Sequence, residues 1–225
     1  MIVRLHNLSA CVPTFKDAQA VTELMRACDI ADFGSTDSTK EDVEKAWKAP
    51  HFDLKSDAWA IVTRQGQLVG YADIRQNRCY EQLVCLVRIH PNYRGRGIGT
   101  LFTLLIEERA RQLACNAHPR RRVTLNFTVS VRNRSAQQLL EREGYMSVKR
   151  FWRLSITDGD TQETLTADLN VEAQDLFDES NLVERTGFYV ARQYEVFEKE
   201  LRPDADGCSD GDESKSHITM EPLVV

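Results

Sequence analysis

The sequence predicts an α/β (α+β) protein in which helices cover both faces of one mixed, mostly antiparallel sheet. Apolar residues alternate at period two in several segments and recur every three or four residues in others, which indicates strands and helices. The two kinds of segment interleave along the chain, but an early hairpin breaks a strict strand-helix-strand series. A length of 225 residues is enough for one sizeable core, or for one domain with an appendage.

The first half of the chain begins with a short strand and two helices. The first helix has a clear apolar stripe, and Ser38 or Thr39 is suited to cap the second, which ends before Pro50. Gln65-Gly66 fits a tight hairpin turn between two strands. The predicted elements are strand 8–12, helix 17–29, the helix following Ser38 or Thr39, and strands 59–64, 67–75 and 80–90.

The second half continues the alternation as far as residue 157. We expect helix 97–114, strand 122–131, helix 135–143 ending at Gly144, strand 145–157 and a final strand at 188–201. Residues 158–180 are polar and acidic, with a helix predicted at 171–177, and the segment beyond 203 has a composition typical of disorder. The predicted organisation is a domain at 1–157, an acidic linker with a further strand at 158–201, and a disordered tail at 202–225.

Composition narrows the classes of function. A net charge of −5 and a pI near 5.6 argue against a nucleic-acid-binding surface. No stretch reaches about 18 apolar residues, and the N-terminus has no signal-peptide pattern, so we expect a cytoplasmic protein without a membrane partner. The six cysteines form no CxxC pair, and no His/Cys cluster has zinc spacing, so no metal is expected. Both a monomer and a homodimer remain open.

The segment VRIHPNYRGRGIGT, residues 87–100, carries the clearest chemistry in the chain. A strand enters a turn rich in arginine and glycine, and a helix follows at once. The free N–H groups of such a turn and helix start attract an anion, glycines allow its close approach, and the guanidinia of Arg94 and Arg96 suit phosphate oxygens. A Walker loop is absent, and the GxGxxG pattern is only partial because residue 100 is Thr.

At these residues the chain resembles the GNAT (GCN5-related N-acetyltransferase) superfamily. Arg94, Gly97 and Gly99 match its first signature, and a second signature follows at Asn133, Ala136, Leu139 and Gly144-Tyr145. The segments GYADI, RIHPNYRGRGIG and LLEREGYMSVKRFWRL also look like the first half of tandem GNAT proteins. NLVERTGFYVARQYEVFEKEL looks like the last piece of a second half, so residues 182–201 either supply the last strand of the sheet or are a degenerate remnant.

The resemblance implies a GNAT fold with a six- to seven-stranded sheet and acetyl-CoA as co-substrate. The strands at 80–90 and 122–131 would splay, with the pantetheine arm pairing along Val87 and Ile89 and Asn133 approaching it from the opposite side. The turn would hold the pyrophosphate through Arg94, Gly95, Arg96, Gly97, Ile98, Gly99 and Thr100.

Acetyl transfer also requires a base for the amine proton and an acid for the departing thiolate. Glu81 is in phase with Val87 and Ile89 along its strand, which makes it the candidate general base, with Asp73 in reserve. Many GNAT enzymes have a tyrosine four residues before the Gly-aromatic pair, but this position is Leu140. Tyr145 is the candidate acid, Tyr80 and Tyr93 are alternatives, and departure of the thiolate without a proton donor is a further alternative because the pKa of a thiol is moderate.

The predicted activity is transfer of acetyl from acetyl-CoA to a primary amine of an unidentified small molecule or protein. Variable loops at 30–55 and 158–187 are expected to form the acceptor pocket, with Asp32, Asp37 and Asp53 available to attract a cation. Two alternatives are a non-catalytic acyl-CoA-binding sensor or scaffold, favoured by the missing tyrosine, and a nucleotide-binding domain.

Overall fold

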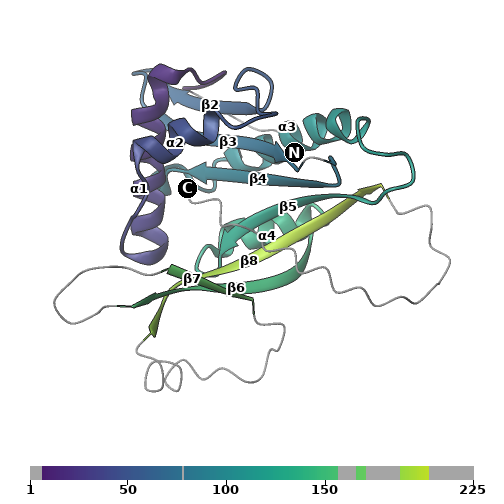
Figure 1. The fold of residues 1–225 in the computed structure, drawn as a ribbon. Helices are drawn as coiled ribbons and strands as arrows, with labels where there is room; N and C mark the ends of the chain where they lie inside the picture. Colours follow the sequence, from purple (N-terminus) through teal and green to yellow (C-terminus); the bar gives the residue numbers. More distant parts are fainter. Residues whose placement is uncertain (1–6, 78, 157–165, 171–187, 203–225) are drawn as a thin grey trace.

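A computed structural model of the protein describes residues 7–77, 79–156, 166–170 and 188–202. These residues form one eight-stranded sheet in the order β1-β2-β3-β4-β5-β8-β6-β7 (Figure 1). Every neighbouring pair is antiparallel except β4 and β5, which run parallel, so the predicted mixed and mostly antiparallel sheet is confirmed. The strands are β1 (Leu8–Cys11), β2 (Ala58–Thr63), β3 (Leu68–Gln76), β4 (Gln82–Ile89), β5 (Val123–Ser130), β6 (Met146–Ile156), β7 (Thr166–Asn170) and β8 (Phe188–Arg202).

Helices cover both faces of the sheet, as predicted (Figure 1). On one face, α1 (Ala18–Phe33) and α2 (Lys40–Trp47) pack on apolar residues of β2 and β3, and a short 3-10 turn (Phe15–Asp17) precedes them. On the other face, α3 (Ile98–Ala114) and α4 (Arg134–Arg142) pack on β3, β4 and β5. A second 3-10 turn (Pro91–Tyr93) joins β4 to the segment that leads into α3.

The helix α1 ends four residues later than the predicted helix at 17–29. It ends at Gly34, whose φ of 82° and N–H bond to the Ile30 carbonyl (2.9 Å) stop the helix. The apolar stripe is interrupted at Asp29, but this carboxylate is buried against Ser38 and against Arg192 of β8. Both contacts come from residues outside the helix. Local periodicity within the helix therefore underestimates its length. Residues 30–33 therefore belong to a helix rather than to a loop.

The strand β8 lies inside the sheet, between β5 and β6, and is hydrogen-bonded to both (Figure 1). For residues 188–201, this position supports the first alternative, that they supply a strand, whereas residues 182–187 lie outside the described residues. The sheet has one strand more than the upper number expected, because β7 pairs with β6 as an edge strand within the acidic segment. The helix predicted at 171–177 and the tail from 203 lie outside the described residues, and the domain boundaries stay a prediction.

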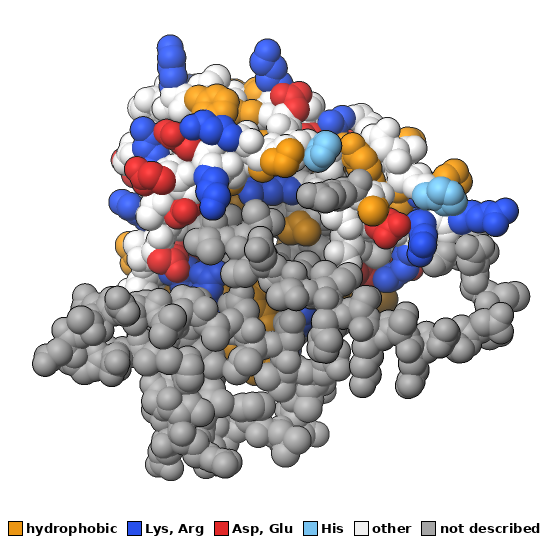
Figure 2. Space-filling model, viewed as in Figure 1, with side chains coloured by type: hydrophobic (Ala, Val, Ile, Leu, Met, Phe, Trp, Pro, Cys, Tyr) orange, Lys and Arg blue, Asp and Glu red, His pale blue; other side chains and the backbone are white. Residues whose placement is uncertain are grey.

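The surface of the described part is mixed in charge. Figure 2 shows Lys and Arg side chains interspersed with Asp and Glu over the described part of this face. Within the residues that the structure covers, no helix is both long and apolar enough to cross a membrane.

Candidate active site

The parallel strands β4 and β5 pair over only half of their length. Their ladder runs from Gln82 opposite Thr124 to Cys85 opposite Phe127, although β4 continues to Ile89 and β5 to Ser130. Beyond this point the two strands diverge toward α1 (Figure 1). The predicted splay is therefore present, and beyond Cys85 and Phe127 neither strand pairs with the other.

Hydrogen bonding fixes which residues of β4 face this split. The His90 N–H donates to the Val69 carbonyl of β3 (2.9 Å), and the Glu81 carbonyl accepts from Thr124 of β5 (2.9 Å). Backbone groups of successive residues point to alternate sides of a strand, so the odd-numbered residues of β4 face β5. The backbone groups of Val87 and Ile89 therefore line the split, where a pantetheine arm would pair.

The turn before α3 presents a row of free amides. Gly95 and Gly97 have φ values of 76° and 86°. This left-handed conformation has a low free-energy cost for glycine but not for residues with a Cβ atom. Within the described chain, the N–H groups of residues 95–100 have no hydrogen-bond acceptor, whereas Leu101 already donates to Gly97 (3.1 Å). Unpaired donors at the positive end of a 17-residue helix form an anion cradle.

The arginines of this turn differ from the expectation. Arg94 makes two hydrogen bonds to Asp32 of α1 (2.8 and 3.2 Å), and Arg96 lies over the Tyr93 ring at 4.6 Å and donates to the Asn92 carbonyl (3.1 Å). Both guanidinia are thus engaged by the protein, and the backbone supplies the free donors. A cation from α4, Arg142, reaches the same place and donates to Thr100 Oγ1 (3.3 Å).

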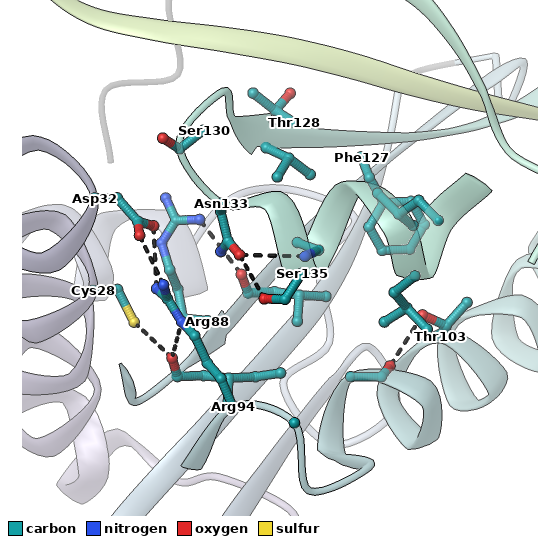
Figure 3. A pocket seen from close by; sticks show the side chains of 18 of the residues that line it. Cys28, Asp32, Arg88, Arg94, Thr103, Phe127, Thr128, Ser130, Asn133 and Ser135 are labelled. Carbon is teal, nitrogen blue, oxygen red and sulfur yellow. Dashed lines mark hydrogen bonds and ion pairs between the residues drawn. The ribbon is translucent and has the colours of Figure 1, made fainter. Parts of the chain in front are cut away.

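A cavity of about 220 Å³ joins the turn, the split and the C-terminal part of α1. Figure 3 shows side chains from α1, β4, β5 and the segment around Asn133 converging on it. Predicted cofactor residues lie along its wall: Val87, Ile89, Arg94, Gly95, Gly97, Gly99, Thr100 and Asn133. The side chain of Ile98 is instead in the core, and Arg96 does not line the cavity.

The α4 side of the cavity is built by close helix packing. Asn133 caps α4, accepting hydrogen bonds from the Ala136 N–H (3.2 Å) and the Ser135 hydroxyl (3.0 Å). A Cβ atom on Gly99 would lie 2.7 Å from Leu139, so glycine is what lets α3 and α4 approach here. Leu140, at the position of the family's tyrosine, is buried and lines the cavity, so the described wall has no hydroxyl at that point.

The predicted bases lie away from the split. Glu81 precedes β4, in the region where β4 and β5 are still paired, and its carboxylate lies 3.8 Å from Arg121. Four residues separate it from the end of the ladder at Cys85, a span of about 13 Å in a strand. The reserve candidate, Asp73, is fully buried and binds Arg75 (2.8 Å) and the Tyr71 hydroxyl (2.8 Å). Neither carboxylate lines the cavity.

Tyr145 is also outside the cavity wall. Its ring packs edge-on against Phe127, and its hydroxyl donates to Glu107 (3.0 Å), which also binds Lys199 (2.8 Å). Burial, followed by the charge of Glu107 and this hydrogen bond, raises the pKa of Tyr145 well above its ordinary value. The structure thus places Tyr145 in a core network, and a role as general acid stays a prediction.

Sequence reasoning missed two residues that the structure places on the cavity wall. Arg88 interrupts the apolar strand β4, which was a detectable signal, and Tyr194 becomes part of the wall only because β8 inserts beside β5. The thiol of Cys28, which also lines the cavity, donates to the Ile89 carbonyl (3.2 Å). Burial raises the pKa of Cys28, and the nearby Arg88 and Arg94 offset part of the rise.

The residues present fit a diphosphate carrying a thioester arm. Free turn amides would receive the diphosphate, the edge of β4 that faces the split would receive the arm, and the cavity connects the two places. No group of three or more potential metal ligands occurs within the described segments.

Solved structures of other proteins share the fold of this chain. A GCN5-related N-acetyltransferase from Sphaerobacter thermophilus superposes with a TM-score of 0.74 at 19% identity, covering 88% of this chain and 96% of that one. A GNAT superfamily phosphinothricin acetyltransferase from Sinorhizobium meliloti, solved in complex with AcCoA, gives 0.55 at 11% identity, covering 89% and 95%. An N-acetyltransferase from Staphylococcus aureus gives 0.56 at 11% identity, covering 87% and 99%.

These likenesses concern the fold, because all three identities are low. No curated protein matches the chain. The model of the acetyltransferase (GNAT) family matches residues 18–145, more than half of the sequence and the part that contains the split, the turn and α4. The chain therefore belongs to the GNAT acetyltransferase family.

Proposed function

We propose that this chain is an N-acetyltransferase that transfers acetyl from acetyl-CoA to a primary amine of a small molecule or protein. The observation that carries the proposal is the split between β4 and β5, with the free amides of residues 95–100 at its mouth. Those amides would hold the diphosphate, with Arg142 adding positive charge. Val87 and Ile89 would pair with the pantetheine arm, and Asn133 would flank it.

The bound acetyl thioester supplies the acyl group. The chain orients the two reactants and supplies the polar groups that stabilise the charge developing between them. The Val87 N–H, which faces the split, is placed to donate to the carbonyl oxygen as negative charge develops on it. The amine enters from the α1 side, its nitrogen forms a bond to the carbonyl carbon, and the bond from carbon to sulfur breaks. Orientation of the two reactants in one cavity accounts for much of the expected acceleration.

Proton transfer on the amine side is proposed to use solvent. The two carboxylates of the described cavity wall, Asp29 and Asp32, are both ion-paired with arginines, so neither is left free to accept the proton. An alkylammonium with a pKa near 10.4 loses its proton at pH 7 at a cost of about 4–5 kcal/mol. For the departing thiolate, we propose Tyr194 as the proton donor, since Tyr194 lines the cavity and Tyr145 does not.

The test is a thiol-release assay with purified full-length protein, acetyl-CoA and a panel of amines. Acetylation of at least one amine, confirmed by mass spectrometry of the product, is the expected result. The alternative is an acyl-CoA-binding sensor or scaffold, which Leu140 in place of the family's tyrosine favours. Tight acetyl-CoA binding with no acetylated product from any amine would select the sensor.

Several finer assignments stand as proposals beside this one. We propose that residues 182–201 complete the sheet of a single domain rather than represent a remnant of a second copy, and the pairing of β8 with both β5 and β6 supports this. The resemblance to the first half of tandem GNAT proteins then reflects shared motifs in that half. A cytoplasmic location is proposed from the sequence alone.

A further inference from the structure

The α1 side of the cavity contains an arginine, Arg88, whose guanidinium has few hydrogen-bond partners in the described part of the chain. Arg88 lines the cavity from β4, and its Nε atom is buried without a hydrogen-bond partner in the described part of the chain. Its Nη1 atom makes one long bond of 3.4 Å, to the carbonyl of the preceding residue. Figure 3 shows the Arg88 side chain beside that of Arg94 at this end of the cavity. A guanidinium has five N–H donors, so Arg88 retains donors for a ligand.

The carboxylates nearest this arginine already have other partners. Asp32 is held by two hydrogen bonds from Arg94, at 2.8 and 3.2 Å. Asp29 accepts from Ser38 (3.0 Å) and lies 3.5 Å from Arg192. Each acid of the described cavity wall is thus matched with an arginine other than Arg88. The positive charge of Arg88 is therefore left for an anion that enters from outside.

The position of Arg88 assigns that anion to the acceptor rather than to the CoA diphosphate. Arg88 alternates with Val87, and it shares a strand face with Leu86, which packs against the α1–α2 core. The diphosphate cradle belongs to the start of α3, which covers the other face. Arg88 lines the same cavity as Val87, whose N–H faces the proposed position of the thioester, so an acceptor bound to Arg88 would share one cavity with the thioester.

We infer that the acceptor is a small amine that carries a carboxylate, and that Arg88 binds this carboxylate. The inference rests on the proposed function and narrows its substrate class to molecules built like amino acids. A guanidinium binds a carboxylate through charge-assisted and often bidentate hydrogen bonds, which the free donors of Arg88 permit. The remaining wall at this end, formed by Phe33 and Tyr194, gives an apolar surface for the rest of the acceptor.

The experiment compares each of the twenty amino acids with its carboxamide, which lacks the negative charge. Because the amine of the carboxamide has the lower pKa, kcat/KM is referred to the concentration of neutral amine. Thiol release is measured with saturating acetyl-CoA for the wild type, Arg88→Gln and Arg88→Lys. For at least one pair we expect kcat/KM of the acid to exceed that of the carboxamide by about tenfold or more, the size of one charge-assisted hydrogen bond. This ratio should fall at least about tenfold in Arg88→Gln, with partial recovery in Arg88→Lys.

The control variant is Arg142→Gln, which removes a cation at the other end of the same cavity. It should weaken acetyl-CoA binding in calorimetry and slow both members of a pair alike, so the ratio stays constant. The inference is overturned if wild-type protein acetylates carboxamides as well as acids, if Arg88→Gln slows both equally, or if Arg88→Gln weakens acetyl-CoA binding tenfold.

A failure of the proposed function would look different, because no amine would then be acetylated at all. Calorimetry on protein loaded with CoA still tests the anion site in that case, with N-acetylated amino acids and their carboxamides as probes. Binding of the acids alone, lost in Arg88→Gln, supports the site without turnover. Absence of such binding for every acid overturns the inference.

Discussion

At the scale of single residues, Arg88 and Arg94 line the same cavity but have different surroundings. Arg94 is held by Asp32 and also donates to the Ile89 carbonyl (3.4 Å), so it ties the turn to α1 and to the end of β4. Ion pairs of this kind keep one geometry only when further hydrogen bonds support them, as here. Arg94 is therefore a residue that shapes the cradle, whereas Arg88 has donors left for a ligand.

The two tyrosines near the site give a residue-scale prediction. Tyr194→Phe should lower kcat with little change in the KM for acetyl-CoA, by roughly 10²-fold if the hydroxyl donates a proton to the thiolate. Tyr145→Phe should instead lower the free energy of unfolding by about 1–3 kcal/mol, because Glu107 loses a buried partner. Steady-state kinetics and urea denaturation of both variants check this. A large kcat loss in Tyr145→Phe with unchanged stability would restore Tyr145 as the acid.

The amine's proton gives a second prediction at this scale. If solvent accepts it, kcat/KM should rise tenfold per pH unit from pH 7 toward the pKa of the amine, because the neutral fraction rises at that rate. Glu81→Gln should leave this profile in place, since its carboxylate pairs with Arg121 where β4 and β5 are still joined. A profile that levels off near pH 7 in the wild type but keeps rising in Glu81→Gln would make Glu81 the base.

At the scale of elements, the site depends on which strands and helices lie next to one another. The sequence predicts the elements themselves better than it predicts their neighbours. The turn at 94–100 can be predicted from the sequence because the conformation of glycine and the start of a helix are local properties. All seven strands predicted from the apolar patterns occur in the structure. Local patterns do not predict contacts between distant segments. They do not show that β8 inserts beside β5, that Asp29 is buried against Arg192, or that Glu81 lies before the split. Tyr194 was missed for the same reason, because the insertion of β8 brings it to the cavity wall, whereas Arg88 was detectable as a charged residue within an apolar strand.

The insertion of β8 gives an element-scale prediction. Phe197 is 1% exposed and packs in the core formed with α3 and β5. Phe197→Ala should lower the free energy of unfolding by about 3–5 kcal/mol, the usual cost of deleting a buried aromatic ring. Met146→Ala, on the neighbouring strand β6 and 71% exposed, is the control and should change little. Urea denaturation of both variants measures these changes in the free energy of unfolding. A small effect of Phe197→Ala would show that β8 contributes little to the core.

At the scale of the whole molecule, two packed layers open at one point to form the site. The cavity is lined by α1 on one side, by α3 and α4 on the other, and by the half-paired strands β4 and β5 between them. We propose that the acceptor occupies the α1 side and the diphosphate the start of α3. The unpaired backbone of that split would be costly in an ordinary buried sheet. A ligand that pairs with the edge of β4 while its diphosphate occupies the free amides would satisfy both sets of groups at once.

The most direct test of this arrangement is calorimetry of acetyl-CoA binding to Thr100→Glu and Thr100→Gln. Thr100 lies in the first turn of α3 and on the cavity wall. The two replacements have nearly the same size and differ in one negative charge. An acid in a first helical turn does not weaken the helix, so both variants should unfold at similar urea concentrations.

Like-charge repulsion with the diphosphate should make the Kd of Thr100→Glu at least about tenfold higher than that of Thr100→Gln, a difference of about 1.4 kcal/mol. This result is expected if the amides of residues 95–100 hold the diphosphate of acetyl-CoA. Equal affinity of the two variants, or no heat from the wild type with millimolar acetyl-CoA, would contradict it.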